Sequence, residues 1–193
     1  GVLEGKAVEV IGFLVRRSVV DGTPYDWREY LLAGENGTYR WLTEYDGHWN
    51  IADVLSNPPA GSGAMELADV NYGGQRFRHF ASAPSAEVVQ VEGEFTWRVR
   101  RGETARVVDY VAPPQMLSRE STANDLNWSL ARYMAPEDVA AAFKLGRMVA
   151  PSGVYANQPN PWEETHRRVC RTFWKLALVA VVLQVFFHFI AGG

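Results

Sequence analysis

The hydrophobic and polar positions of this chain follow two patterns, and the first is a series of short β-rich runs. Turn signals such as Asp21-Gly22, Asn36-Gly37 and Asp46-Gly47 separate the first runs. Because such short connections join only antiparallel neighbours, the first four runs predict an antiparallel meander. The predicted strands cover residues 7–16, 25–33, 38–46, 48–54, 65–72, 75–81, 86–91, 95–100, 106–111, 115–120 and 126–133.

The second pattern is a continuous apolar run near the C-terminus. Residues from Leu176 to Ala191 are almost all apolar. As a helix, the segment from Phe173 to Ala191 would reach across a hydrocarbon core of about 30 Å. The run therefore predicts a transmembrane helix. The chain starts at Gly1 and stops directly after this run, and we interpret it as a fragment of a longer protein.

These patterns predict four segments. Residues 1–135 form a β-rich domain, with a candidate internal boundary at the Pro-, Gly- and Ser-rich residues 56–64. A proline followed by two acids starts a short helix within residues 136–146. A Pro-rich linker covers residues 147–160, and a juxtamembrane and transmembrane helix covers residues 161–191. The expected fold class is mainly β: an antiparallel meander, barrel-like or folded into two sheets, with one short helix and a C-terminal transmembrane α-helix.

Charge is distributed unevenly along the chain, whose formal net charge is −3. The acidic balance before the tail argues against nucleic acid as a partner. No acid follows Glu164, and four basic residues precede or border the apolar run: Arg167, Arg168, Arg171 and Lys175. Positive charge before a transmembrane helix places the preceding domain in the cytoplasm, with the lipid bilayer as a partner. The cluster either sets this topology alone or also binds anionic lipid.

Three other residues of the tail suggest specific roles. Gln184 and His188 are four residues apart and share one helix face, which predicts contact with another transmembrane helix or protein subunit. The single cysteine, Cys170, excludes an internal disulfide and a cysteine-based zinc site, and its position suits palmitoylation. No pair of histidines has metal-ligand spacing, so we expect neither a metal nor a cofactor.

Six residues in the first meander form the candidate binding site: Trp27, Glu29, Trp41, Glu44, His48 and Trp49. Tryptophans beside acids suit a groove for a cationic ligand or a peptide. The alternative is that the aromatic residues only pack in the core and between strands. The spatial arrangement of the six side chains, around a cavity or within a core, distinguishes the two interpretations.

Short motifs between residues 3 and 135 carry a family resemblance. They are Gly5, Val-Ile-Gly at 10–12, Trp-Arg-Glu-Tyr-Leu-Leu at 27–32, Trp-Leu-Thr-Glu at 41–44, Gly-His-Trp at 47–49, Tyr-Gly at 72–73, Phe77, Gly-Glu-Phe-Thr-Trp at 93–97 and Asp-Tyr at 109–110. Together they resemble the bacterial family named domain of unknown function 4178. The resemblance implies the second of two tandem units followed by membrane helices, hence a bacterial inner membrane. It implies no activity.

The leading functional hypothesis is a membrane-tethered cytoplasmic β-domain that binds a protein partner, a peptide or a small cationic ligand at the membrane surface. No catalytic constellation is predicted. One alternative is a membrane-bound hydrolase that uses Glu29, Glu44 or His48. Another is a structural subunit of a membrane complex.

Overall fold

The computed structural model describes residues 1–59, 68–160, 162, 169–170 and 172–174. The chain divides into two units, Gly1–Gln158 and Pro159–Gly193. No helix within the described residues has the length and apolar character needed to cross a bilayer. The predicted transmembrane run at 176–191 lies outside the described residues, as do the basic cluster and the Gln184/His188 face.

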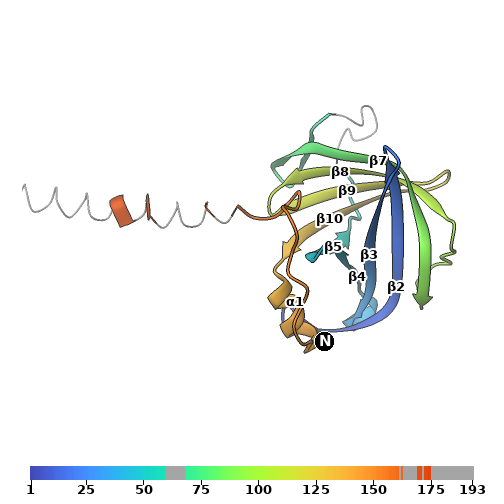
Figure 1. Cartoon of the computed structure of the whole chain (residues 1–193), viewed down its shortest axis with the longest axis horizontal. Helices are drawn as coiled ribbons and strands as arrows, with labels where there is room; N and C mark the ends of the chain where they lie inside the picture. The colour runs from blue at the N-terminus through green and yellow to red at the C-terminus, as the bar shows by residue number, and fades with distance from the viewer. Residues whose placement is uncertain (60–67, 161, 163–168, 171, 175–193) are drawn as a thin grey trace, which may run out of the picture. The chain divides into compact units, whose positions relative to one another are not determined.

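The strands of the first unit form one antiparallel sheet, which confirms the predicted mainly-β class with one short helix (Figure 1). Within the described residues the elements are β1 (Val2–Leu3), β2 (Lys6–Val20), β3 (Thr23–Gly34), η1 (Glu35–Gly37), β4 (Tyr39–Tyr45), β5 (His48–Val54), β6 (Val70–Tyr72), β7 (Gln75–Gly93), β8 (Thr104–Ala112), β9 (Gln115–Ser121), β10 (Leu126–Met134) and α1 (Pro136–Phe143).

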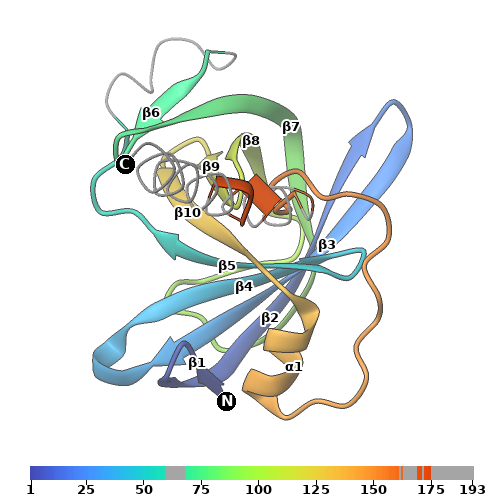
Figure 2. The ribbon, with the colours of Figure 1, turned by 90° about the vertical axis from the view of Figure 1, so that its left-hand side faces the viewer.

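The sheet closes on itself. Two four-stranded meanders, β2 to β5 and β7 to β10, are joined at both edges because β5 pairs with β10 and β2 pairs with β7. Figure 2 shows β4 and β5 on one side of the unit and β7 and β8 on the other. Of the two predicted arrangements, the barrel-like one is therefore observed. Because side chains alternate along a strand, each strand of the closed sheet has one set of side chains that points inward and one set that points outward.

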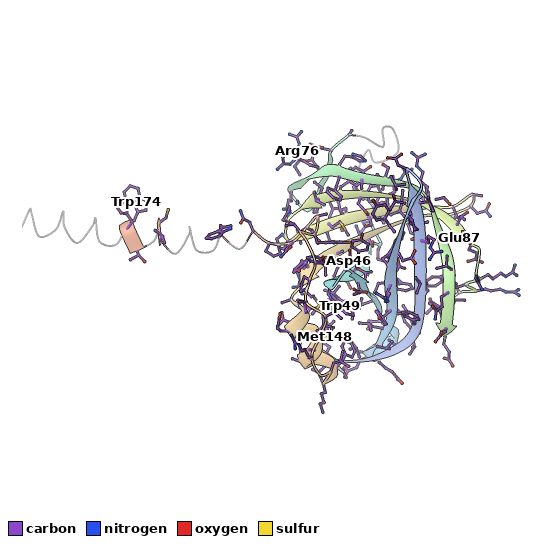
Figure 3. All side chains as sticks on the ribbon, viewed as in Figure 1. Asp46, Trp49, Arg76, Glu87, Met148 and Trp174 are labelled. Carbon is purple, nitrogen blue, oxygen red and sulfur yellow. The ribbon has the colours of Figure 1, made fainter. Side chains whose placement is uncertain are left out.

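Hydrophobic cores cover the outside of the sheet. One lies under β1 and α1 and contains Leu3, Leu32, Leu42, Ile51, Met134 and Val139. Trp49 and Met148 pack against it on the side of α1 (Figure 3). The helix starts with Pro136, as predicted, and stops at Phe143 because Lys144 adopts a left-handed cap conformation (φ 54°). A second outer core includes Phe77, Tyr110, Leu117 and Trp128.

Two predicted strand boundaries were wrong. The runs at 75–81 and 86–91 belong to one strand, β7, because bulges absorb the irregular residues between them. The run at 95–100 is not a strand, although its alternation resembles one. Phe95 packs on Gly12 instead: a Cβ on Gly12 would lie 2.9 Å from the Phe95 ring and 2.6 Å from the Glu94 carbonyl oxygen.

The predicted linker packs against the sheet. Residues 147–158 belong to the first unit, and Asn157 is completely buried. We refer to residues 150–158 as the strap. Its composition is typical of a linker, but Tyr155 and Asn157 find partners among the strands and hold it there. The candidate boundary at 56–64 likewise lies within this one unit.

Candidate functional site

The inward face of the closed sheet carries carboxylates from three strands. Strand register places Glu29 of β3 opposite Leu14 and Thr43. On the other meander, Asp109 of β8 lies opposite Ser118, and Glu120 of β9 lies opposite Val107. Carboxylates that are distant in sequence therefore face one enclosed space.

Arg16 is the buried cation of this face, and no other arginine or lysine of the described residues is buried. Its Nη2 donates a 2.9 Å hydrogen bond to Glu120 Oε1, and its Nε lies 3.4 Å from Glu29 Oε2. Burial lowers the pKa of Arg16, but the nearby carboxylates outweigh this effect and leave the pKa raised. One guanidinium thus lies beside two carboxylates, Glu29 and Glu120.

The ionised form of Glu29 is energetically unfavourable even though Glu29 pairs with Arg16. Burial raises its pKa, and the charge of Arg16 offsets only part of that effect. The indole Nε1–H of Trp27 donates a 2.6 Å hydrogen bond to Glu29 Oε1, which favours the charged form. Trp27 and Glu29 are two residues apart on β3 and therefore share the inward face.

Asp109 has a weaker set of partners. The Ser118 hydroxyl donates a 2.5 Å hydrogen bond to Asp109 Oδ1. Burial raises the pKa of Asp109 to about 6; the Ser118 hydrogen bond opposes this shift, and the charge of Glu29 adds to it. No cationic side chain of the described residues is among these causes. Arg16 balances the charge of Glu120. The charge of Asp109, which also lies inside the sheet, is not balanced in this way.

The Glu29 and Asp109 side chains point inward and are largely but not completely buried. The Glu29 side chain keeps 15% of its surface exposed. The neighbouring inward positions hold small residues: Gly12, Ala52, Ala86, Ala105, Ser118, Ser129 and Ala131. Eight-stranded barrels have interiors that side chains just fill or that hold one small ligand. Aromatic rings lie on several of these small residues: Phe95 packs on Gly12, and Tyr155 packs beside Ala52 and Ala131.

The strap lies against this interior near the β4–β5 turn. Tyr155 stacks on His48 with ring centroids 5.4 Å apart and also contacts Tyr45. Burial raises the pKa of Tyr155, and the charges of Asp109, Tyr45 and Glu29 add to the shift. Asn157 Nδ2 donates to Asn50 Oδ1 (2.8 Å) and to the Pro114 carbonyl oxygen (3.0 Å).

The six predicted site residues do not all meet. Trp27, Glu29, Trp41 and His48 lie on the inward face. Glu44 and Trp49 lie on the outward face, because each is one residue out of phase with an inward neighbour.

The two outward residues have structural partners. Glu44 accepts hydrogen bonds from Arg28 (2.5 Å) and from the Gly47 backbone N–H (2.8 Å). Trp49 stacks on Tyr30 with centroids 5.8 Å apart. Both residues therefore support the turn and the outer core rather than the interior.

Sequence reasoning missed several inward polar residues: Arg16, Asp109, Ser118, Glu120, Tyr155 and Asn157. A signal for Asp109 was present. It interrupts the β-branched and aromatic run Val107-Val108-Asp109-Tyr110-Val111, in which a charged residue is costly unless the inward face is polar. Within the described residues, no group of three potential metal ligands gathers.

The family model named Domain of unknown function (DUF4178) matches residues 1–136. This chain belongs to the DUF4178 family. No curated protein and no solved structure matches it significantly. The DUF4178 match ends at the first residue of α1, so all the strands with their inward carboxylates lie in the family domain, whereas the strap follows it.

Proposed function

We propose that this DUF4178 domain is a binding module that holds a small organic cation, such as a protonated amine, inside the closed sheet. The observation that carries the proposal is the environment of Asp109. It is an inward carboxylate whose hydrogen-bond donor is a serine hydroxyl and whose pKa is raised further by the charge of another carboxylate, Glu29. An ammonium group beside Asp109 would balance this charge.

The energetics favour a cation over a neutral ligand. With a pKa of about 6, Asp109 is mainly ionised at pH 7 although its site disfavours charge. Charge-assisted hydrogen bonds are roughly twice as strong as neutral ones, and they gain strength where water is excluded. Trp27 and Trp41 add aromatic surface on the same inward face, and aromatic faces attract cations by about 0.5–2 kcal/mol.

The other functional hypotheses gain less support. For a hydrolase that uses Glu29, Glu44 or His48, Glu44 lies on the opposite face of the sheet from Glu29 and His48, so the three groups do not converge. A peptide groove that uses Trp49 is less supported, because Trp49 stacks on Tyr30 and packs in the outer core. The alternative of a structural membrane subunit depends on Gln184 and His188, which lie outside the described residues.

The proposal is tested by calorimetric titration of the protein with n-butylammonium, tetramethylammonium, n-butanol and butyrate at pH 7.5. These probes separate charge from size. We expect the ammonium compounds to bind at least about tenfold more tightly than butanol, and butyrate not to bind. Equal affinity for butanol and butylammonium, or binding of neither ammonium compound, contradicts the proposal.

We also propose that the domain works at the cytoplasmic face of a bacterial inner membrane. The apolar run at 176–191 and the basic residues before it support this location. Deletion of residues 176–191 is expected to move the expressed protein from the membrane fraction to the supernatant after ultracentrifugation. An intact chain that is found in the supernatant would contradict the proposal.

A further inference from the structure

We propose that the strap, residues 150–158, is a gate over the interior site, with the Tyr155 side chain occupying the entrance to the two carboxylates Glu29 and Asp109. The identity of the ligand that the gate admits rests on the proposed function. The gate itself rests on how the strap is held, which can be tested without a ligand.

The position of Tyr155 is the first reason. Its ring lies flat against His48 (interplanar angle 23°) and also packs near Ala52, Met116 and Ala131 on the inward face. Glu29 and Asp109 belong to the same inward face. The phenol therefore lies on the inner side of the closed sheet, where an entering ligand must displace it or pass it.

The contacts that hold the strap are the second reason. At one end, the Ser152 backbone N–H donates to the Asp46 carbonyl oxygen (2.9 Å), and His48 Nε2 donates to the Ser152 carbonyl oxygen (3.0 Å). At the other end, Asn157 makes its two hydrogen bonds to Asn50 and Pro114. These are loop contacts outside the strand ladder, so the strap can open without breaking a strand pair.

The incomplete polar contacts beneath the strap are the third reason. Within the described residues, Asn50 Nδ2 and Asn157 Oδ1 are buried without a hydrogen-bond partner. Buried polar groups without partners raise the energy of the closed state, which brings the closed and open states closer in energy.

The test measures access to the interior directly. In the full chain carrying Cys170→Ser, a reporter cysteine is placed on the inward face of β10 by Ser129→Cys, and its labelling by a neutral maleimide is timed. Adding Asn157→Ala removes the hydrogen bonds to Asn50 and Pro114. We expect labelling to accelerate by about tenfold. A reporter on an exposed position, Ser85→Cys, should label at the same rate with and without Asn157→Ala.

A second variant separates gating from general destabilisation. Val139→Ala weakens the outer core beneath α1 without touching the strap. The two variants are compared at equal loss of melting temperature. If the strap is a gate, Asn157→Ala accelerates labelling of the Ser129→Cys reporter more than Val139→Ala does. Equal acceleration by both variants, or none by Asn157→Ala, overturns the proposal. Tyr155→Ala should act like Asn157→Ala, whereas Tyr155→Phe, which keeps the ring, should label like the parent.

Stopped-flow binding of n-butylammonium then distinguishes failure of the gate from failure of the cation proposal. Faster association in Asn157→Ala supports both proposals. Faster labelling without any amine binding supports the gate and rejects the cation. Amine binding with unchanged association and labelling rates rejects the gate and retains the cation.

Discussion

Ser118 and Asp109 lie directly opposite each other on β9 and β8, and the serine hydroxyl donates a 2.5 Å hydrogen bond to the aspartate. This bond only partly offsets burial, which raises the pKa of Asp109 from 3.8 to about 6. A carboxyl with a raised pKa in the folded state makes the fold more stable in its protonated form. Above pH 6 the ionised Asp109 therefore lowers the free energy of unfolding.

Replacing Asp109 with asparagine is expected to stabilise the protein at pH 7. The amide keeps an oxygen for the Ser118 hydroxyl and removes the buried charge. We expect the free energy of unfolding in urea to rise by about 1–3 kcal/mol, in line with the size of the pKa shift. The exposed carboxylate in the Arg40–Asp53 pair provides the control, because Asp53→Asn should change stability by less than about 1 kcal/mol.

The sign of this effect depends on pH. Below pH 4 the Asp109 carboxyl is protonated in both the folded and the unfolded state, so the advantage of Asp109→Asn should disappear there. It should appear as the pH rises from 4 to 6 and stay constant above that range. A destabilised Asp109→Asn variant at pH 7 would show that Asp109 supports the fold and is not an unbalanced charge.

Binding of n-butylammonium should weaken as the pH falls through about 6. A cation favours ionised Asp109, so the free protein must lose its proton on binding when the pH is below that value. The apparent affinity should fall by up to about tenfold per pH unit below 6. Calorimetric titrations from pH 5 to 8 measure this dependence. Asp109→Asn should bind weakly at every pH, and a pH-independent affinity in the parent would place the cation elsewhere.

Removing the buried cation should destabilise the fold strongly. Arg16→Met leaves Glu29 and Glu120 facing each other without a counter-charge, and breaking one partner of a buried ion pair costs about 3–5 kcal/mol. Arg17→Met breaks the exposed Arg17–Asp26 pair on the other face of β2 and should cost less than about 1 kcal/mol. Urea unfolding of the two variants makes the comparison. Similar losses would mean that Arg16 is not the charge that balances the interior.

The sequence predicted the strand pattern well because turn signals and alternation are local properties. It left open whether the sheet closes into a barrel or forms two sheets, since the pairing of β2 with β7 joins residues such as Leu14 and Val91 that no local pattern links. The inward face of each strand depends on this closure. Glu29 and Glu44 therefore seemed equivalent in the sequence, although they lie on opposite faces. Tyr155 was missed because its segment has the composition of a linker.

This difference between two glutamates leads to the last prediction. Glu29→Gln removes an inward carboxylate, so the affinity for n-butylammonium should fall several-fold at pH 7.5. It also removes the negative charge beside Arg16, so some loss of stability accompanies it. Glu44→Gln should leave the affinity unchanged. It should lower the free energy of unfolding by about 1–2 kcal/mol, because Glu44 holds Arg28 and the Gly47 backbone N–H on the outward face. Calorimetry for binding and urea unfolding for stability separate the two effects. An equal loss of affinity in both variants would contradict an interior site, since only one of the two carboxylates faces it.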